Sequence, residues 1–162
     1  MKKKHTVFLL LGLIIFVVDQ ISKSYIDKTI QIYQIKSIIP GFLRITKTYN
    51  KGVVFGFLNG IGNPIISNII TMISVSALIV LIYLFLKSNT SFIAELSMTM
   101  IVAGAMGNIF DRIVRGRVVD FIEAYYKRYS FPVFNIADSF ITIGVILLIL
   151  CELRRKDASD TN

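Results

Sequence analysis

The sequence predicts an all-α membrane protein with four transmembrane helices and a small outer-face β-sheet element. Of its 162 residues, 54% are hydrophobic and 17% are charged, which is more apolar than an ordinary soluble domain. The apolar residues also gather into four blocks, each long enough to cross a bilayer as a helix. The blocks are residues 6–25, 64–86, 92–110 and 136–153.

Each block must satisfy its own backbone hydrogen bonds, because hydrocarbon offers no partners. The strands of a membrane barrel would alternate apolar and polar residues, and these blocks do not. The connecting residues are too few to build a second core. We therefore expect a single integral membrane domain over residues 1–162, with an outer loop at 111–134.

The first block begins like a secretory signal, since Lys2–Lys4 precede it. It ends, however, in Asp19, Gln20 and Lys23 without a small-residue cleavage site, so we expect a retained anchor. An even number of spans puts both termini on one side, and the basic residues at the two ends favour the cytoplasm. The opposite loops hold more Lys and Arg in total, but the first helix usually dominates the orientation.

Residues 30–57 on the outer side are typical of a small β structure. Pro40-Gly41 indicates a turn, and apolar Leu43 and Ile45 alternate with polar neighbours. A second turn is indicated by Asn50-Lys51-Gly52. Such a sheet can hold an extended peptide as an added strand, or it can be a structural plug; the sequence alone favours neither.

The net charge of +8 does not indicate a nucleic-acid partner, because the basic residues are dispersed and form no recognisable motif. Anionic lipid headgroups are the simpler partner. The only histidine, His5, lies in the cytoplasmic tail, and the only cysteine, Cys151, fits a buried thiol. These positions disfavour zinc sites and histidine-based triads, so we expect no metal and no cofactor.

Asp138 lies at the start of the last apolar block. If Asn135 is the N-cap, Asp138 falls at the third helical position, where an acid complements the helix dipole and can cap the helix. Taken alone, Asp138 is better explained as a cap than as a catalytic group.

Asp120 interrupts the apolar run from Val118 to Ile122, and such surroundings raise the pKa of a carboxyl group. Pairing with Arg115 or Arg117 explains this residue equally well when it is taken alone. Together, however, Asp120 and Asp138 suit a dyad in which one carboxyl takes a proton from water and the other gives one. Such a pair titrates as a unit.

Helical spacing places four polar or small residues on or near one face of the third block. They are Gly104, Asn108, Asp111 and Arg112. Ala103 and Gly107 form a small-xxx-small pair that permits close packing. Arg112 can bind carbonyl or lipid oxygens, and Asn108 can hold a neighbouring helix or a substrate main chain.

Two further pairs have helical i, i+4 spacing. Asp19 and Lys23 fit a partly exposed ion pair at the outer end of the first helix, and this structural role is favoured over catalysis. Asp111 and Arg115 fit a structural pair on the third helix.

Five stretches in order resemble the bacterial lipoprotein signal peptidases, also called signal peptidase II. The matching residues are Asp19-Gln20 with Lys23, Asn50 with Gly52 and Phe55-Gly56, Gly104 to Asn108 with Asp111-Arg112, Gly116 with Val118 to Phe121, and Phe134 to Asp138. The resemblance runs from Asp19 to Gly144. Each stretch alone is weak evidence, and the set is specific.

This resemblance implies an aspartyl endopeptidase of the bacterial cytoplasmic membrane that cleaves diacylglyceryl-modified prolipoproteins just before the lipidated cysteine. It implies Asp120 and Asp138 as the catalytic pair and globomycin-type cyclic peptides as inhibitors. Substrate-binding residues would be Asn50, Gly52, Asn108, Arg112 and Asn135, with structural support from Asp19, Lys23, Asp111 and Gly104. We expect membrane lipids as neighbours and a monomer as the working unit.

Two other classes of function are compatible with intramembrane acids. A small proton-coupled carrier or channel would use the two aspartates as a relay. It needs a polar path to both faces, and the cytoplasmic halves of the helices offer chiefly Ser74, Ser76 and Thr99. A non-enzymatic lipid-binding scaffold would tolerate amides in place of both acids.

Overall fold

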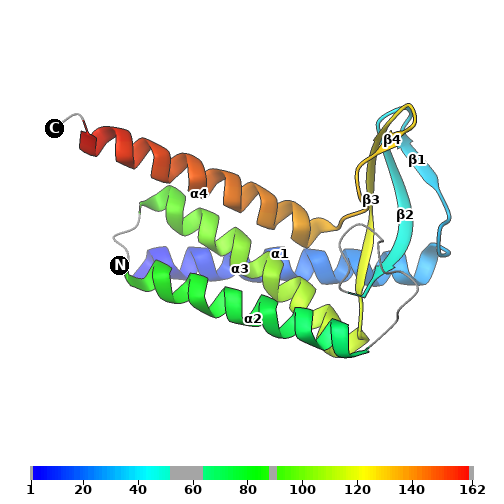
Figure 1. Cartoon of the computed structure of the whole chain (residues 1–162), viewed down its shortest axis with the longest axis horizontal. Coiled ribbons are helices and arrows are strands. Elements are labelled where there is room, and N and C mark those ends of the chain that lie inside the picture. The colour runs from blue at the N-terminus through cyan, green and yellow to red at the C-terminus, as the bar shows by residue number, and fades with distance from the viewer. Residues whose placement is uncertain (1, 52–63, 88–90, 161–162) are drawn as a thin grey trace.

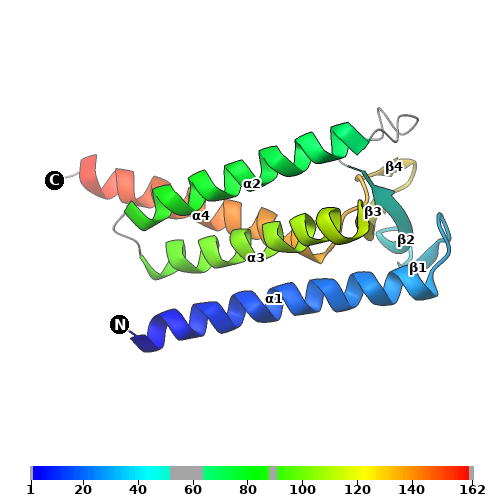
Figure 2. The ribbon, with the colours of Figure 1, turned by 90° about the horizontal axis from the view of Figure 1, so that it is seen from below.

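The computed structural model describes residues 2–51, 64–87 and 91–160. Four helices run back and forth, so that the N- and C-terminal ends lie together at one end of the bundle and a sheet lies at the other (Figure 1). The helices are α1 (Lys2–Thr29), α2 (Pro64–Lys87), α3 (Phe92–Arg115) and α4 (Ile136–Asp160). Helix α3 contacts each of the other three (Figure 2).

Three of the described helices are long and apolar enough to cross a membrane. The spans are Thr6–Thr29, Phe92–Arg115 and Ile136–Lys156, and α2 contributes a shorter apolar stretch, Asn68–Tyr83. Large apolar side chains on the helices face outward: Leu9 is 75% exposed and Ile113 is 70% exposed. Lipid is the solvent that suits such surfaces, and the chain is a membrane protein.

Helix α3 has clear signals at both ends. The side chain of its N-cap residue Ser91 accepts a hydrogen bond from the backbone N–H of Ala94, which satisfies one free donor of the first turn. Its C-cap residue Gly116 adopts the left-handed conformation, with φ 67°, and donates its backbone N–H to Arg112 O. Glycine adopts this conformation at little cost, and the chain turns here directly into the sheet.

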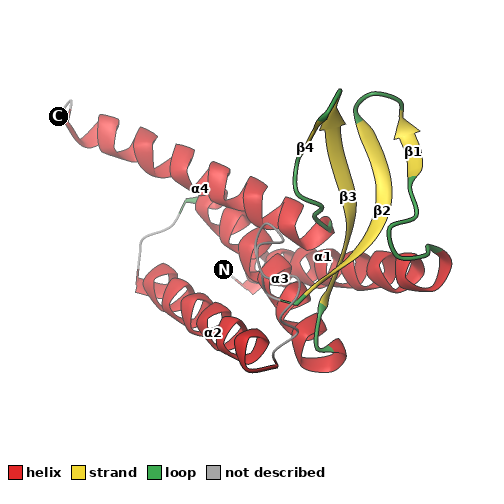
Figure 3. Ribbon diagram, turned by 45° about the vertical axis from the view of Figure 1, so that its right-hand side comes forward, coloured by secondary structure: helices red, strands yellow, loops and turns green. Residues whose placement is uncertain are grey.

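The sheet is antiparallel, with strand order β1-β2-β3-β4 (Figure 3). Its strands are β1 (Lys36–Ile39), β2 (Leu43–Asn50), β3 (Val118–Tyr126) and β4 (Tyr129–Ser130). Buried Ile26 of α1 and Ile30, which directly follows α1, pack against Val119 and Phe121 of β3. This small core fixes the sheet on the end of α1.

The structure differs from the sequence prediction in two places. Residues 111–134, expected as an outer loop, contain the last turn of α3 and strands β3 and β4. The first helix continues to Thr29, beyond its predicted end at Tyr25, because Ile26 in the added turn is buried against β3. The Pro40-Gly41 turn is confirmed, with Gly41 at φ 80°, whereas Gly52 lies outside the described residues.

Candidate active site

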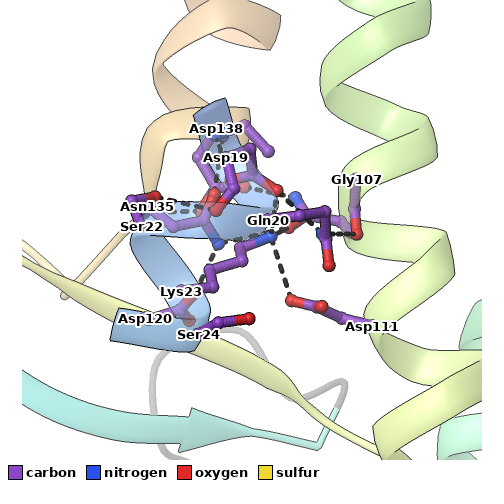
Figure 4. A network of polar contacts seen from close by, with 12 residues as sticks. Asp19, Gln20, Ser22, Lys23, Ser24, Gly107, Asp111, Asp120, Asn135 and Asp138 are labelled. Carbon is purple, nitrogen blue, oxygen red and sulfur yellow. Dashed lines mark hydrogen bonds and ion pairs between the residues drawn. The ribbon is translucent and has the colours of Figure 1, made fainter. Parts of the chain in front are cut away.

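A polar network occupies the sheet end of the helix bundle (Figure 4). It contains residues from α1, α3, β3 and the start of α4, and most of its side chains are removed from solvent. The buried members are Asp19, Lys23, Asn108, Asp111, Asp120 and Asn135. Burying so many charged and polar groups is costly unless they are mutually paired, so their partners define the site.

Asn135 and Asp138 form a reciprocal cap at the start of α4. Asn135 Oδ1 accepts a hydrogen bond from the backbone N–H of Asp138 (2.9 Å). Asp138 Oδ2 accepts one from the backbone N–H of Asn135 (3.1 Å). This is the geometry of a capping box, so the predicted cap is confirmed. Asp138 still has its second oxygen, Oδ1, directed at another residue, Asn108.

Asp120 lies in the buried part of β3, opposite Thr48 of β2. Burial and the negative charge of Asp138 raise the pKa of Asp120 to about 6, against hydrogen bonds from the side chains of Asn135 and Asn50 and the charge of Lys23. A group with this pKa is poised to exchange protons near neutrality.

The arginines considered as partners for Asp120 are engaged elsewhere. Arg115 forms an ion pair with Asp111, and the guanidinium of Arg117 lies 3.5 Å from the ring centroid of Tyr49. The predicted Asp111–Arg115 pair is thereby confirmed. Asp120 instead accepts hydrogen bonds from side-chain amides and is exposed to the negative charge of Asp138.

Two asparagine amides connect the two carboxyl groups. Asn135 Nδ2 donates to Asp120 Oδ1 (2.6 Å) and to Asn108 Oδ1 (3.1 Å). Asn108 Nδ2 donates to Asp138 Oδ1 (2.7 Å). The acids therefore come from separate elements, β3 and α4, and meet in one hydrogen-bonded unit. One carboxyl is bound to a helix N-terminus and the other lies among apolar neighbours, which is the asymmetry that acid-base chemistry requires.

Comparisons with known proteins identify the family of the chain. A sequence profile of the family described as Signal peptidase (SPase) II matches residues 11–154. The chain belongs to the signal peptidase II family. It is 37% identical to a lipoprotein signal peptidase of Staphylococcus haemolyticus (strain JCSC1435), over 98% of each chain. It is 38% identical to one from Staphylococcus aureus (strain JH9), over 99% of this chain and 96% of the relative.

Two solved structures described as bacterial membrane enzymes share the fold. One, at 2.3 Å resolution, has a TM-score of 0.80 and 39% sequence identity, and the alignment covers 97% of this chain and 92% of the solved chain. The other, at 1.9 Å resolution, has a TM-score of 0.75 and 38% sequence identity, and the alignment covers 91% of this chain and 93% of the solved chain. Membership of the signal peptidase II family makes this chain a peptidase.

Arg112 faces the two acids from α3, where the negative charges of Asp120 and Asp138 act on its guanidinium. Its Nε is buried and has no hydrogen-bond partner among the described residues. A buried donor without a partner costs about 1–3 kcal/mol. Within the described part of the chain, the Nε–H group of Arg112 is therefore free to donate a hydrogen bond to another molecule bound at the site.

The Asp19–Lys23 pair is more buried than expected. Lys23 Nζ lies 2.8 Å from Asp19 Oδ2 and 3.0 Å from Asp111 Oδ2, and both the Lys23 and Asp19 side chains are 0% exposed. The prediction of a partly exposed pair was wrong, because α3 and the start of α4 cover this face of α1.

Sequence reasoning missed the polar partners of Arg115. Its guanidinium donates to Gln20 Oε1 (3.1 Å) and to Ser24 Oγ (3.0 Å). Gln20 also donates to the backbone oxygen of Gly107 (3.2 Å). The i, i+4 spacing of Gln20 and Ser24, parallel to that of Asp19 and Lys23, was the signal that could have identified them.

Proposed function

We propose that this member of the signal peptidase II family removes the signal peptide from diacylglyceryl-modified prolipoproteins by hydrolysis with Asp120 and Asp138. The observation that carries the proposal is the hydrogen-bonded unit in which Asn135 and Asn108 join these two carboxyl groups. Cleavage falls just before the lipidated cysteine. The reaction is of the aspartic endopeptidase type and needs no covalent intermediate.

The active form carries one proton on the pair. The ionised carboxylate takes a proton from water as its oxygen attacks the scissile carbonyl carbon, and the protonated carboxyl gives its proton toward the carbonyl oxygen. Collapse of the tetrahedral intermediate breaks the C–N bond, and a proton passes from the dyad to the leaving amine. Positioned proton transfer of this kind contributes about 10²–10⁴-fold to rate.

The substrate-binding residues of the proposal surround the pair. Arg112 offers its unpartnered Nε to a carbonyl oxygen, and Asn50 binds Asp120 from the end of β2. Asn108 and Asn135 hold both acids in place. Gly52 completes the set in the proposal, although it lies outside the described residues.

We further propose four membrane spans, with both termini in the cytoplasm and the site at the outer face of the bacterial cytoplasmic membrane. Helix α2 has 24 residues and is about 36 Å long, which is enough to cross the hydrocarbon core. The two chain ends lie at the end of the bundle opposite the sheet (Figure 1), and Lys and Arg gather near both of them. One chain supplies the whole described network, so we propose a monomer.

The test is cleavage by the purified protein in lipid. A diacylglyceryl-modified precursor should be cut before its modified cysteine, and globomycin should prevent the reaction. The same precursor without the lipid is the matched control and should be cut at least about tenfold more slowly, since the lipid chains contribute binding in the bilayer. Equal cutting of both precursors, or none of either, would contradict the proposed specificity or activity.

The pH dependence of kcat/KM should show a basic limb near pH 6. Asp120 faces the negative charge of Asp138 from α4, together with Lys23 from α1 and Arg112 from α3. Its pKa of about 6 means that the shared proton is retained below this pH and lost above it. We expect kcat/KM to fall by up to about tenfold per pH unit above the limb. A rate that rises steadily from pH 6 to 9 would contradict the assignment of the shared proton.

A further inference from the structure

The ammonium group of Lys23 has an unusual set of partners for a residue read as a helix-end ion pair. Its side chain is fully buried, and besides two carboxylates Nζ donates to Asn108 Oδ1 at 2.9 Å. Figure 4 shows Lys23 reaching from α1 into the centre of the network. Its third contact therefore connects the ion pair to the amide that binds Asp138.

The Asn108 amide can be accommodated in only one orientation. Lys23 Nζ and Asn135 Nδ2 are both donors, and both point at Asn108 Oδ1. An ammonium group has no acceptor to offer. Turning the amide over would place its NH₂ against these two donors and its oxygen against Asp138 Oδ1, which now accepts from Asn108 Nδ2. Lys23 and Asn135 together therefore determine which end of the amide faces the carboxyl.

Asp19 holds Lys23 and the start of α4 together. Asp19 Oδ2 contacts Lys23 Nζ (2.8 Å), while Asp19 Oδ1 accepts from the backbone N–H of Ala137 in the first turn of α4 (2.9 Å). A Cβ on Gly107 would lie 2.5 Å from Asp19 Oδ2, so α3 leaves space for this carboxylate by having no side chain there. The pair thus fixes α1 relative to both elements that position Asp138.

We propose that Lys23, held by Asp19, is a positioning residue of the hydrolytic site, which orients the Asn108 amide so that Nδ2 is directed at Asp138. This inference rests on the proposed function. A buried ion pair that served packing alone could be replaced by apolar side chains at no cost or with a gain in stability. An apolar side chain in place of Lys23 could not donate the hydrogen bond that orients Asn108.

The decisive variant is Lys23→Met with Asp19→Asn, which removes the ammonium group and one buried negative charge together. Asp111 keeps Arg115 as its counter-ion, and the asparagine that replaces Asp19 keeps an oxygen for the N–H of Ala137. Lys23→Met alone would leave Asp19 buried without its cation and could unfold the protein. The exposed Lys28 at the end of the same helix supplies the matched control, Lys28→Met.

We expect the double variant to fold and to lose about 10- to 100-fold in kcat, the usual effect of disordering a supporting contact. KM should stay within about twofold, because Lys23 binds no substrate group. The basic limb of the pH profile should move to higher pH, since the charge of Lys23 lowers the pKa of Asp120. Lys28→Met should behave as the parent protein.

Replacing Lys23 with Gln in the Asp19→Asn background returns an uncharged N–H donor, and should recover part of kcat while the limb stays shifted. If the methionine variant does not fold, this variant carries the test. Parental kcat, or a loss of kcat without movement of the limb, would overturn the positioning role. That outcome is distinct from failure of the proposed function, in which Asp120→Asn itself would retain activity.

Discussion

Asp138→Asn should lower kcat/KM for a lipidated precursor by at least about 10³-fold, because an amide can neither take a proton from water nor give one to the leaving amine. The fold should persist. Asparagine at this position still has an oxygen to accept the backbone N–H of Asn135, as Asp138 does now at 3.1 Å. Cleavage of the purified variant in lipid, with thermal unfolding measured in parallel, checks both expectations.

Asp120→Asn should cause a loss of the same size for the same reason. It should leave the melting temperature unchanged or raise it, because burial raises the pKa of Asp120 and so disfavours its charge. Glu152→Gln is the matched control, since Glu152 is an exposed carboxyl on α4, and it should leave kcat/KM within about twofold. A near-normal rate in either aspartate variant would exclude the dyad.

The helices and the cap were accessible from sequence because their signals are local. Each apolar block became a described helix, and the Asn135-x-x-Asp138 spacing that predicted an N-cap is a capping box in the structure. Side chains within one helical turn determine such features. No knowledge of the rest of the chain is needed.

Strand β3 was missed because its evidence is not local. Val118–Tyr126 contains Asp120 and Glu123 among apolar residues, and it pairs with β2, which is remote in sequence. A strand of this kind depends on its partner, and no pattern within the segment identifies that partner. The pairing is nevertheless essential to the site, since it positions Asp120 near Asn50.

The burial of Asp19 and Lys23 was misjudged for a related reason. Their i, i+4 spacing is the same for a solvated pair and for a buried one. Burial is decided by what α3 presents opposite them, namely Gly107, Asn108 and Asp111. The sequence places Asp19 on α1 and Asp111 on α3. Only the packing of the two helices shows that both acids contact Lys23.

Gly104→Ala should reduce both stability and activity, because a Cβ at Gly104 would lie 2.5 Å from the carbonyl oxygen of Ala137 and 2.8 Å from Ile141 Cγ1. The first of these contacts is with backbone, so α4 must move away from α3. Overpacking of this kind costs about 1–3 kcal/mol. Ala137 immediately precedes Asp138, so the same shift should draw Asp138 from Asn108 and lower kcat by about 10²-fold.

Gly12→Ala is the matched control for this prediction. A Cβ at Gly12 would meet Thr99 Cγ2 at 3.5 Å and the Ala103 Cβ at 3.9 Å, which are ordinary contacts. Since alanine is favoured over glycine inside a helix by about 0.5–1 kcal/mol, this variant should be as stable as the parent or more so, with unchanged kcat. If Gly104→Ala melts and cleaves like Gly12→Ala, the close approach of α3 to α4 does not position Asp138.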